Sequence, residues 1–190
     1  MFRLRVESSS EWLETILGDF DTFLVNHAIC ERKASATAMS FISHYPDRRK
    51  LVEEMLQLAQ EELEHFREVV EILHSRNLML RKDEKDLYVT SLRKEIRNGS
   101  EVYLLDRLLV AGVIEARGCE RFDKIATALK EGELKDFYRR FTRAEAQHTS
   151  LFLQLAKTYF PTATVEDRYH QLLDREAEIL PKLPLRPVLH

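Results

Sequence analysis

The sequence predicts an all-α protein built around a four-helix bundle, and three observations lead to this prediction. Glycine and proline are rare, five of each in 190 residues, and 32% of the residues are charged, as is typical of helical proteins. Four long segments repeat apolar residues with the period of about 3.6 that a helix requires. The order hairpin, long crossover, hairpin then arranges these segments as one domain, 1–190, with a core bundle at about 20–160.

A short helix is predicted before the bundle. Ser8 and Glu11 have the spacing of a capping box, and the apolar residues that follow end at Gly18. The first bundle helix is predicted over about 21–44, with Asp21 as its N-cap residue. The chain therefore enters the bundle through a short helix, which we expect to cover one end of it.

A tight turn around Pro46 follows, because proline ends the preceding helix. The second bundle helix is predicted over about 47–76, antiparallel to the first. Residues 77–99 are polar and weakly periodic, so they are predicted to form a long connection that contains some helix.

The second hairpin is predicted over about 100–132 and 133–159, with Ser100 as the N-cap residue of its first helix and Gly132 at the turn. Thr164 is predicted to cap a last helix that ends at Ile179. Three prolines beyond this point predict an extended tail.

The two hairpins carry the same pattern of ionisable residues, a glutamate followed about thirty residues later by Glu-x-x-His. Residues three apart lie on one face of a helix, where both side chains can reach the same metal ion. The six residues are Glu31, Glu62, His65, Glu115, Glu145 and His148.

Helical phase separates these six residues from a third Glu-x-x-His, Glu71 to His74. Each of the six falls in the apolar stripe of its helix, whereas Glu71 lies nine residues after Glu62 and faces the opposite way. The six are therefore predicted to point inward, roughly 20–25 Å from each turn. Buried carboxylates without compensation would each cost several kcal/mol, and two divalent cations would balance four of them.

The donor set favours iron or manganese over structural zinc, because it contains oxygen and nitrogen donors and no thiolate. This is the arrangement of ferritin-like di-metal bundles, which suits O2 activation at a di-ferrous centre. Small residues near the ligands, such as Gly112, either let helices pack closely or leave room for oxygen and a substrate.

His27, one turn before Glu31, is interpreted as a core histidine with an ordinary partner, the alternative being a role behind the ligands. Cys119 is interpreted as core packing.

Two strings are far more discriminating than Glu-x-x-His, namely HAICERKA (27–34) and IEARGCERF (114–122), and they accompany the Glu-x-x-His string EAQH (145–148). They resemble the MiaE family, bacterial tRNA hydroxylases that act on 2-methylthio-N6-isopentenyladenosine next to the anticodon. The resemblance extends from about Phe20 to the C-terminal helix, and all six ligand positions match. It implies a non-haem di-iron monooxygenase with two iron ions, O2 as co-substrate and an external electron donor. The implied partners are the anticodon loop of tRNA, whose isopentenyl group is hydroxylated, and an electron-transfer protein.

The net charge of the chain restricts how it can bind RNA. A net charge of −3 and a pI near 6.2 predict no bulk attraction to nucleic acid, so a local basic patch is required. Two clusters are candidates for substrate binding, with solvated helix charge as the alternative for each: Arg48, Arg49 and Lys50, and Arg139, Arg140 and Arg143.

Two cysteines are too few for a disulfide framework, which predicts a reduced, cytoplasmic setting. We expect no membrane span and no signal peptide, because no apolar run is long enough. The oligomeric state is left open.

Two classes of protein are alternatives to the di-iron monooxygenase: a ferritin-like or rubrerythrin-like iron oxidase or peroxidase of the same fold, and a metal-free helical interaction module. Rubrerythrins usually carry Cys-x-x-Cys pairs, which the chain lacks. An iron-storage ferritin would need a shell-forming surface, so a monomer or dimer in light scattering would argue against it, and a metal-free module would contain no metal.

Overall fold

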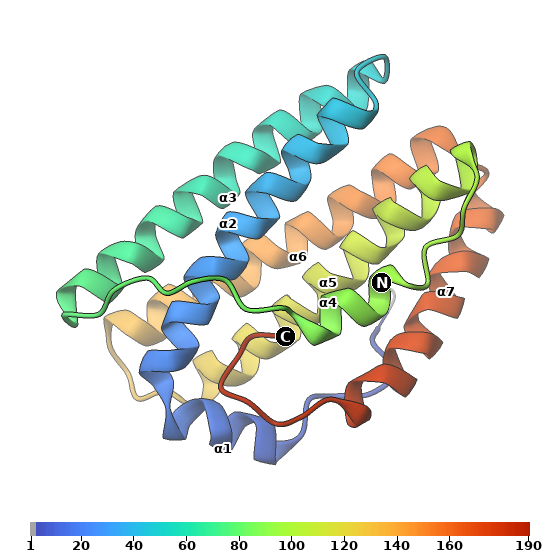
Figure 1. The fold of residues 1–190 in the computed structure, drawn as a ribbon. Helices are drawn as coiled ribbons and strands as arrows, with labels where there is room; N and C mark the ends of the chain where they lie inside the picture. The colour runs from blue at the N-terminus through green and yellow to red at the C-terminus, as the bar shows by residue number, and fades with distance from the viewer. Residues whose placement is uncertain (1–2) are drawn as a thin grey trace. The chain divides into compact units, whose positions relative to one another are not determined.

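The computed structural model describes residues 3–190, and within this range all regular secondary structure is helical (Figure 1). The predicted all-α class is therefore confirmed. Backbone contacts divide the chain into two compact units, and each unit holds one of the predicted hairpins. Each unit is described by itself below, and the single-domain organisation of 1–190 stays a prediction.

The first-hairpin unit comprises 14–84 and 185–189. Its long helices α2 (Phe20–His44) and α3 (Arg49–Ser75) lie side by side (Figure 1) and are joined by the turn 45–48. Each helix buries residues at helical spacing, such as Leu24 and Ala28 on α2 and Met55 on α3. The Ser35 hydroxyl donates a hydrogen bond to the carbonyl of Ala59 at 2.8 Å, which fixes the two helices at mid-length.

The start of α2 differs from the prediction. Asp19, not Asp21, is the N-cap residue, because its side chain accepts a hydrogen bond from the Thr22 amide at 3.2 Å. Asp21 instead accepts two hydrogen bonds from the Arg76 guanidinium, at 2.7 and 2.9 Å. A charged donor is a stronger partner than a backbone amide, so this pair takes Asp21 away from the cap and closes the open end of the hairpin.

The predicted capping box before the bundle is also wrong. The short helix α1 (Ser10–Gly18) directly follows Ser9. The Ser9 hydroxyl accepts a hydrogen bond from the Trp12 amide at 3.2 Å. Ser8 donates its amide and its hydroxyl to the carboxylate of Glu120, at 2.9 and 2.7 Å. A long-range carboxylate has therefore displaced the local motif.

The second-hairpin unit comprises 85–184 together with 3–13 and His190. It begins with α4 (Leu87–Arg93), which confirms the helix expected inside the long connection; Asp86 caps it by accepting from the Val89 amide at 2.8 Å. Gly99 has a φ of 119°, a conformation that favours glycine. It takes the N-cap position that was predicted for Ser100.

The remaining helices follow the predicted order. They are α5 (Ser100–Ala128), α6 (Glu133–Tyr159), α7 (Thr162–Ile179) and a short 3-10 helix, η1 (Leu180–Lys182). The bounds of α6 match the prediction, whereas α5 ends four residues before Gly132 and α7 begins two residues before Thr164. Because η1 directly follows α7, the chain stays helical for one more turn after Ile179 before the tail becomes extended.

Close packing and buried charge hold this unit together. A Cβ atom added to Gly112 on α5 would lie 3.4 Å from the Cβ of Phe152 on α6, so the two helices lie close together at this point. The buried Asp106 accepts hydrogen bonds from Arg97 and from Arg168 of α7, at 2.8–2.9 Å. These contacts attach α7 and the segment before α5 to α5 itself. No helix within 3–190 has the length and apolar character needed to cross a membrane.

Candidate metal centre

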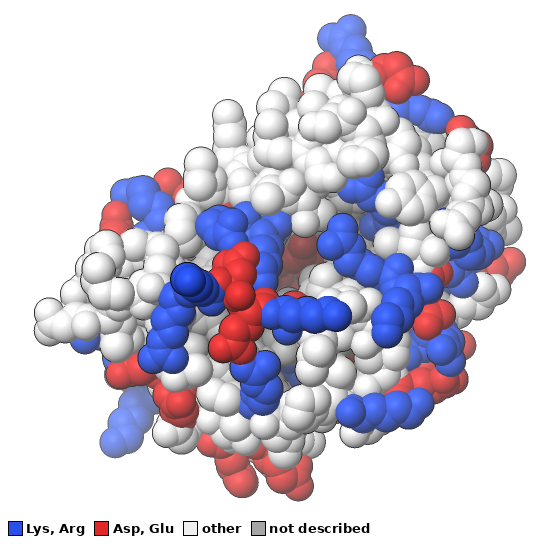
Figure 2. Space-filling view, viewed as in Figure 1, with Lys and Arg blue, Asp and Glu red and all other residues white. Residues whose placement is uncertain are grey.

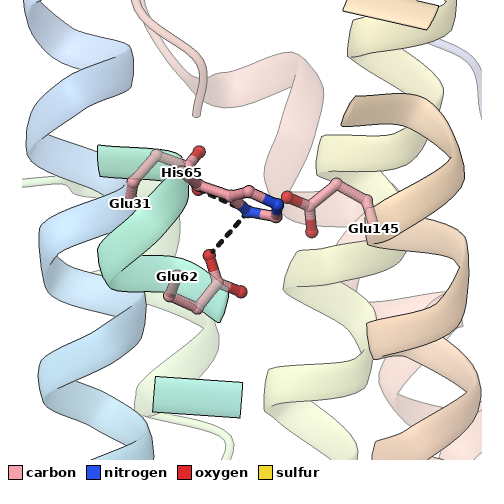
Figure 3. A group of neighbouring side chains, drawn as sticks. All are labelled: Glu31, Glu62, His65 and Glu145. Carbon is pink, nitrogen blue, oxygen red and sulfur yellow. Dashed lines mark ion pairs between the residues drawn. The ribbon is translucent and has the colours of Figure 1, made fainter. Parts of the chain in front are cut away.

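The first-hairpin unit gathers three of the predicted ligands into a triad. Glu31 comes from α2, and Glu62 and His65 come from α3. The Nδ1 atom of His65 lies 3.6 Å from Glu31 Oε2 and 3.4 Å from Glu62 Oε2, so the imidazole is in contact with both carboxylates (Figure 3). Glu31 and Glu62 are at most 3% exposed, and His65 is mostly buried. Two acidic groups therefore share one imidazole in a site with little water.

The electrostatics of this triad favour a bound cation. Burial by itself would lower the pKa of His65, but the contacts and charges of Glu31 and Glu62 outweigh it and raise that pKa to about 10. Without a metal ion, the imidazole therefore carries a proton at neutral pH and supplies positive charge to the carboxylates. Metal binding requires the neutral imidazole, so a cation would take the place of this proton. Buried oxygen and nitrogen donors of this kind fit iron.

The second-hairpin unit builds the same arrangement. Glu115 comes from α5, and Glu145 and His148 come from α6. One ligand atom of each residue lies within 4.8 Å of those of the other two, as is also true of the first triad. The Nδ1 atom of His148 lies 3.5 Å from Glu145 Oε2; both residues are buried, and Glu115 is half-buried. Each hairpin therefore supplies two carboxylates and one imidazole.

All six predicted ligands thus lie in one of two triads of identical composition. The inward orientation predicted from helical phase agrees with their burial, since four of the six are at most 3% exposed. The assembly of the two triads into one six-residue centre stays a prediction.

His27 has a closer connection to the ligands than the sequence interpretation gave it. It is fully buried on α2, and its Nε2 atom lies 2.9 Å from Oε1 of Glu31. Its ring stacks on Phe23, with centroids 5.9 Å apart. His27 is therefore a core histidine whose partner is a predicted ligand, so its alternative role behind the ligands stays a prediction. The spacing of four residues on one helix was the signal for this contact.

Cys119 is a structural residue, as predicted. It is half-buried, and its thiol donates a hydrogen bond to the Thr142 carbonyl at 3.3 Å. Burial, together with the charge of Glu145 and other nearby carboxylates, raises the pKa of Cys119 to about 11. The sulfur of the metal-free protein therefore stays protonated at neutral pH.

A buried ion pair close to Glu115 was missed by the sequence analysis. Arg117, two residues along α5, is fully buried and donates to both oxygens of Glu176 on α7, at 2.8 and 3.0 Å. Glu120 accepts from the same guanidinium at 2.9 Å, and the Tyr88 hydroxyl donates to Glu176 at 3.1 Å. The pair anchors α7 to the helix that carries Glu115. The string IEARGCERF contains the arginine but gives no indication of a partner 59 residues away.

The two basic clusters are partly neutralised by their own helices. Arg49 and Lys50 each pair with a glutamate one turn later. The guanidinium of Arg139 lies 3.4 Å from Oδ1 of Asp136. The guanidinium of Arg140 lies over the ring of Phe137, one turn earlier on the same helix. Figure 2 likewise shows acidic side chains interspersed among lysine and arginine. These contacts agree with solvated helix charge, and a role in binding RNA stays a prediction.

Comparisons with known proteins agree with this geometry. The model of the family "tRNA-(MS[2]IO[6]A)-hydroxylase (MiaE)" matches residues 2–190. The tRNA 2-(methylsulfanyl)-N(6)-isopentenyladenosine(37) hydroxylase of Pseudomonas putida is 38% identical over 154 residues, which are 81% of this chain and 75% of the relative. The enzyme of the same name from Salmonella typhimurium is 38% identical over 109 residues, or 57% and 40% of the two chains.

A solved structure extends the likeness to the whole fold. It is a Synechococcus protein with aldehyde deformylating oxygenase activity, 31% identical to this chain, with a TM-score of 0.95 over 100% of this chain and 96% of the other. The predicted ferritin-like order of helices, two hairpins joined by a long connection, is confirmed by this match and by the helices themselves. Since the family model covers nearly every residue, the chain belongs to the tRNA-(MS[2]IO[6]A)-hydroxylase (MiaE) family.

Proposed function

We propose that the chain is a di-iron, O2-dependent monooxygenase that hydroxylates the isopentenyl group of 2-methylthio-N6-isopentenyladenosine in tRNA, next to the anticodon. The family match over 2–190 and the names of both relatives support the substrate. The observation that carries the chemistry is the repeated triad, because each hairpin brings two carboxylates and one imidazole together, with one ligand atom of each residue within 4.8 Å of the others.

Each triad is suited to hold one iron ion. Glu31, Glu62 and His65 would hold the first, and the second would be held by the matching residues of the other hairpin. With its imidazole neutral, a triad carries two negative charges, which one ferrous ion balances. Two triads therefore account for two irons per chain without a further charged residue.

When bound, the two irons supply the activation of O2. In the overall reaction, a C–H bond of a terminal isopentenyl carbon is replaced by a C–O bond, and the second oxygen atom leaves as water. Two electrons and two protons come from an external electron donor. The carboxylates hold the metals, and their burial limits access of bulk water to the reacting atoms. Because the substrate is tRNA, we place the reaction in the cytoplasm, with an electron-transfer protein as the second partner.

The proposal is tested with purified protein loaded anaerobically with ferrous iron. The reduced protein is given isotopically labelled O2 and an anticodon stem-loop that carries the prenylated nucleoside. We expect the nucleoside to gain one labelled oxygen atom, measured by mass spectrometry after digestion. His65→Ala should abolish this product, whereas His74→Ala, in the third Glu-x-x-His, should retain it because His74 is exposed. Absence of product from protein with about two irons bound would refute the proposal.

Two other functions are compared in the same experiment. The full-length structural match makes aldehyde deformylation the second candidate, so a long-chain aldehyde is offered in place of the stem-loop. An iron oxidase or peroxidase would instead consume ferrous iron or peroxide with no organic substrate. The higher identity of the two hydroxylases, 38% against 31%, favours oxygen transfer to the nucleoside over aldehyde deformylation.

A further inference from the structure

The two triads differ in the residue that lies one helical turn before their first glutamate. The ligands are of the same type in both hairpins, but the residues one turn before the first glutamate are not. His27 precedes Glu31 on α2, whereas Ala111 precedes Glu115 on α5, each by four residues. Residues four apart are neighbours on a helix surface. The first triad therefore has a polar group behind its first carboxylate at a place where the second has only a methyl group.

The geometry of Glu31 shows what this polar group does. Its Oε1 atom lies 2.9 Å from Nε2 of His27, and its Oε2 atom lies 3.6 Å from Nδ1 of His65. The two oxygens therefore contact different imidazoles, Oε1 that of His27 and Oε2 that of the predicted ligand His65. Glu31 is thus placed to offer Oε2 to a metal while Oε1 lies against His27.

The environment of His27 keeps this contact in place. The His27 side chain has no surface accessible to water, and its ring stacks on the buried Phe23. A buried imidazole has few rotamers available, so the position of its Nε2 atom is fixed. Ala111 is also buried, but it has no group that can fix a carboxylate oxygen.

We propose that His27 is a positioning residue that holds Glu31 as a one-oxygen ligand and thereby makes the first triad the tighter of two unequal iron sites. This inference rests on the proposed function, because it requires iron in the triads. Groups that hold a metal ligand from behind typically change metal affinity by about 10- to 100-fold when they are removed. The inequality is a property of the chain itself, since it follows from a difference between its two repeats.

The test is an anaerobic titration of the metal-free protein with ferrous iron, followed by calorimetry. The wild-type protein should bind two irons in two steps of different affinity. His27→Phe keeps the aromatic ring but removes the donor, so it should weaken the tighter step by about 10- to 100-fold and leave the weaker step unchanged. Mössbauer spectra of the bound ferrous iron should change for one of the two irons only.

A second pair of variants keeps the inference testable if His27→Phe does not fold. His27→Gln and His27→Asn both carry an amide donor, but the asparagine is shorter and cannot reach Glu31 equally well. We expect His27→Gln to retain the tight step and His27→Asn to lose it. Phe41→Leu, a buried change farther along α2, is the control, and it should lower stability without changing iron affinity.

The outcomes separate this inference from the proposed function. If the wild-type protein binds about two irons and every His27 variant binds both as tightly, with unchanged spectra, the positioning role is wrong and the proposed function stands. Equal affinities for His27→Gln and His27→Asn would also contradict the positioning role. If the wild-type protein binds no iron, the proposed function itself fails.

Discussion

The buried pair between Arg117 and Glu176 gives a stability prediction whose size follows from the structure. Neither side chain has accessible surface, and two hydrogen bonds of 2.8 and 3.0 Å join them. Burial by itself would lower the pKa of Arg117, but the hydrogen bonds and charge of Glu176 outweigh it, so that pKa is raised. The Arg117 guanidinium is therefore charged at neutral pH. Glu176→Gln keeps the shape of the side chain and removes its charge.

The expected cost comes from a buried guanidinium that has lost its main counter-charge. Removal of one partner from a buried ion pair costs about 3–5 kcal/mol. We expect about 3 kcal/mol here, because Glu120 still accepts from Arg117 at 2.9 Å and glutamine can still accept one hydrogen bond. A protein of this size changes its Tm by about 2–4 °C per kcal/mol. Glu176→Gln should therefore lower the Tm by about 6–12 °C.

The measurement is thermal unfolding followed by circular dichroism, with a matched control on the same helix. Glu178 is 54% exposed and pairs with Arg175, which is 47% exposed. Glu178→Gln should change the unfolding free energy by less than about 1 kcal/mol, because exposed ion pairs contribute little. The reasoning is refuted if the two variants melt within about 2 °C of each other.

Three further predictions concern the triads and the surface. In the metal-free protein, the pKa of His65 is about 10 when folded and 6.5 as its ordinary value; its stabilising contribution is therefore complete below pH 6.5 and is lost as pH rises toward 10. Denaturant midpoints across this range should fall, and His65→Ala should remove that part of the fall. Cys119 should resist alkylation at pH 8 until denaturant is added, because burial raises its pKa to about 11; rapid labelling of the folded protein would contradict this. If Arg48, Arg49 and Lys50 bind tRNA phosphates, neutralising all three should reduce the salt slope of binding by up to about 2, and an unchanged slope in filter binding would exclude the cluster.

Much of the helical framework was predictable because its signals are local. The apolar period and the glycine and proline positions placed α6 at Glu133–Tyr159 without error. The starts of other helices were less predictable, since their capping residues have partners elsewhere. Asp21 pairs with Arg76, and Ser8 pairs with Glu120. In both cases a charged long-range partner is stronger than the local amide that the sequence motif offered.

The six predicted ligands could be identified for a different reason. A carboxylate in the apolar stripe of a helix conflicts with its surroundings, and the conflict is visible in the sequence. The contact between His27 and Glu31 was within reach of the same reasoning, because both residues lie on one helix. The pairing of Arg117 with Glu176 was not, since the choice of one glutamate among many depends on how α7 packs on α5. The sequence therefore indicated which buried charged groups need a partner more readily than it indicated which residues are those partners.

The two triads can be understood as two versions of one charge-balanced unit. Without metal, protonation of His65 supplies one positive charge to two carboxylates, so the first triad retains a negative charge in a buried place. A ferrous ion that replaces this proton supplies two, and the triad becomes neutral. Glu115, Glu145 and His148 offer the same types of ligand to a second ferrous ion. The two sets of ligands are of the same type, so their surroundings are the source expected for a difference in iron affinity, and His27 opposite Ala111 is one such difference.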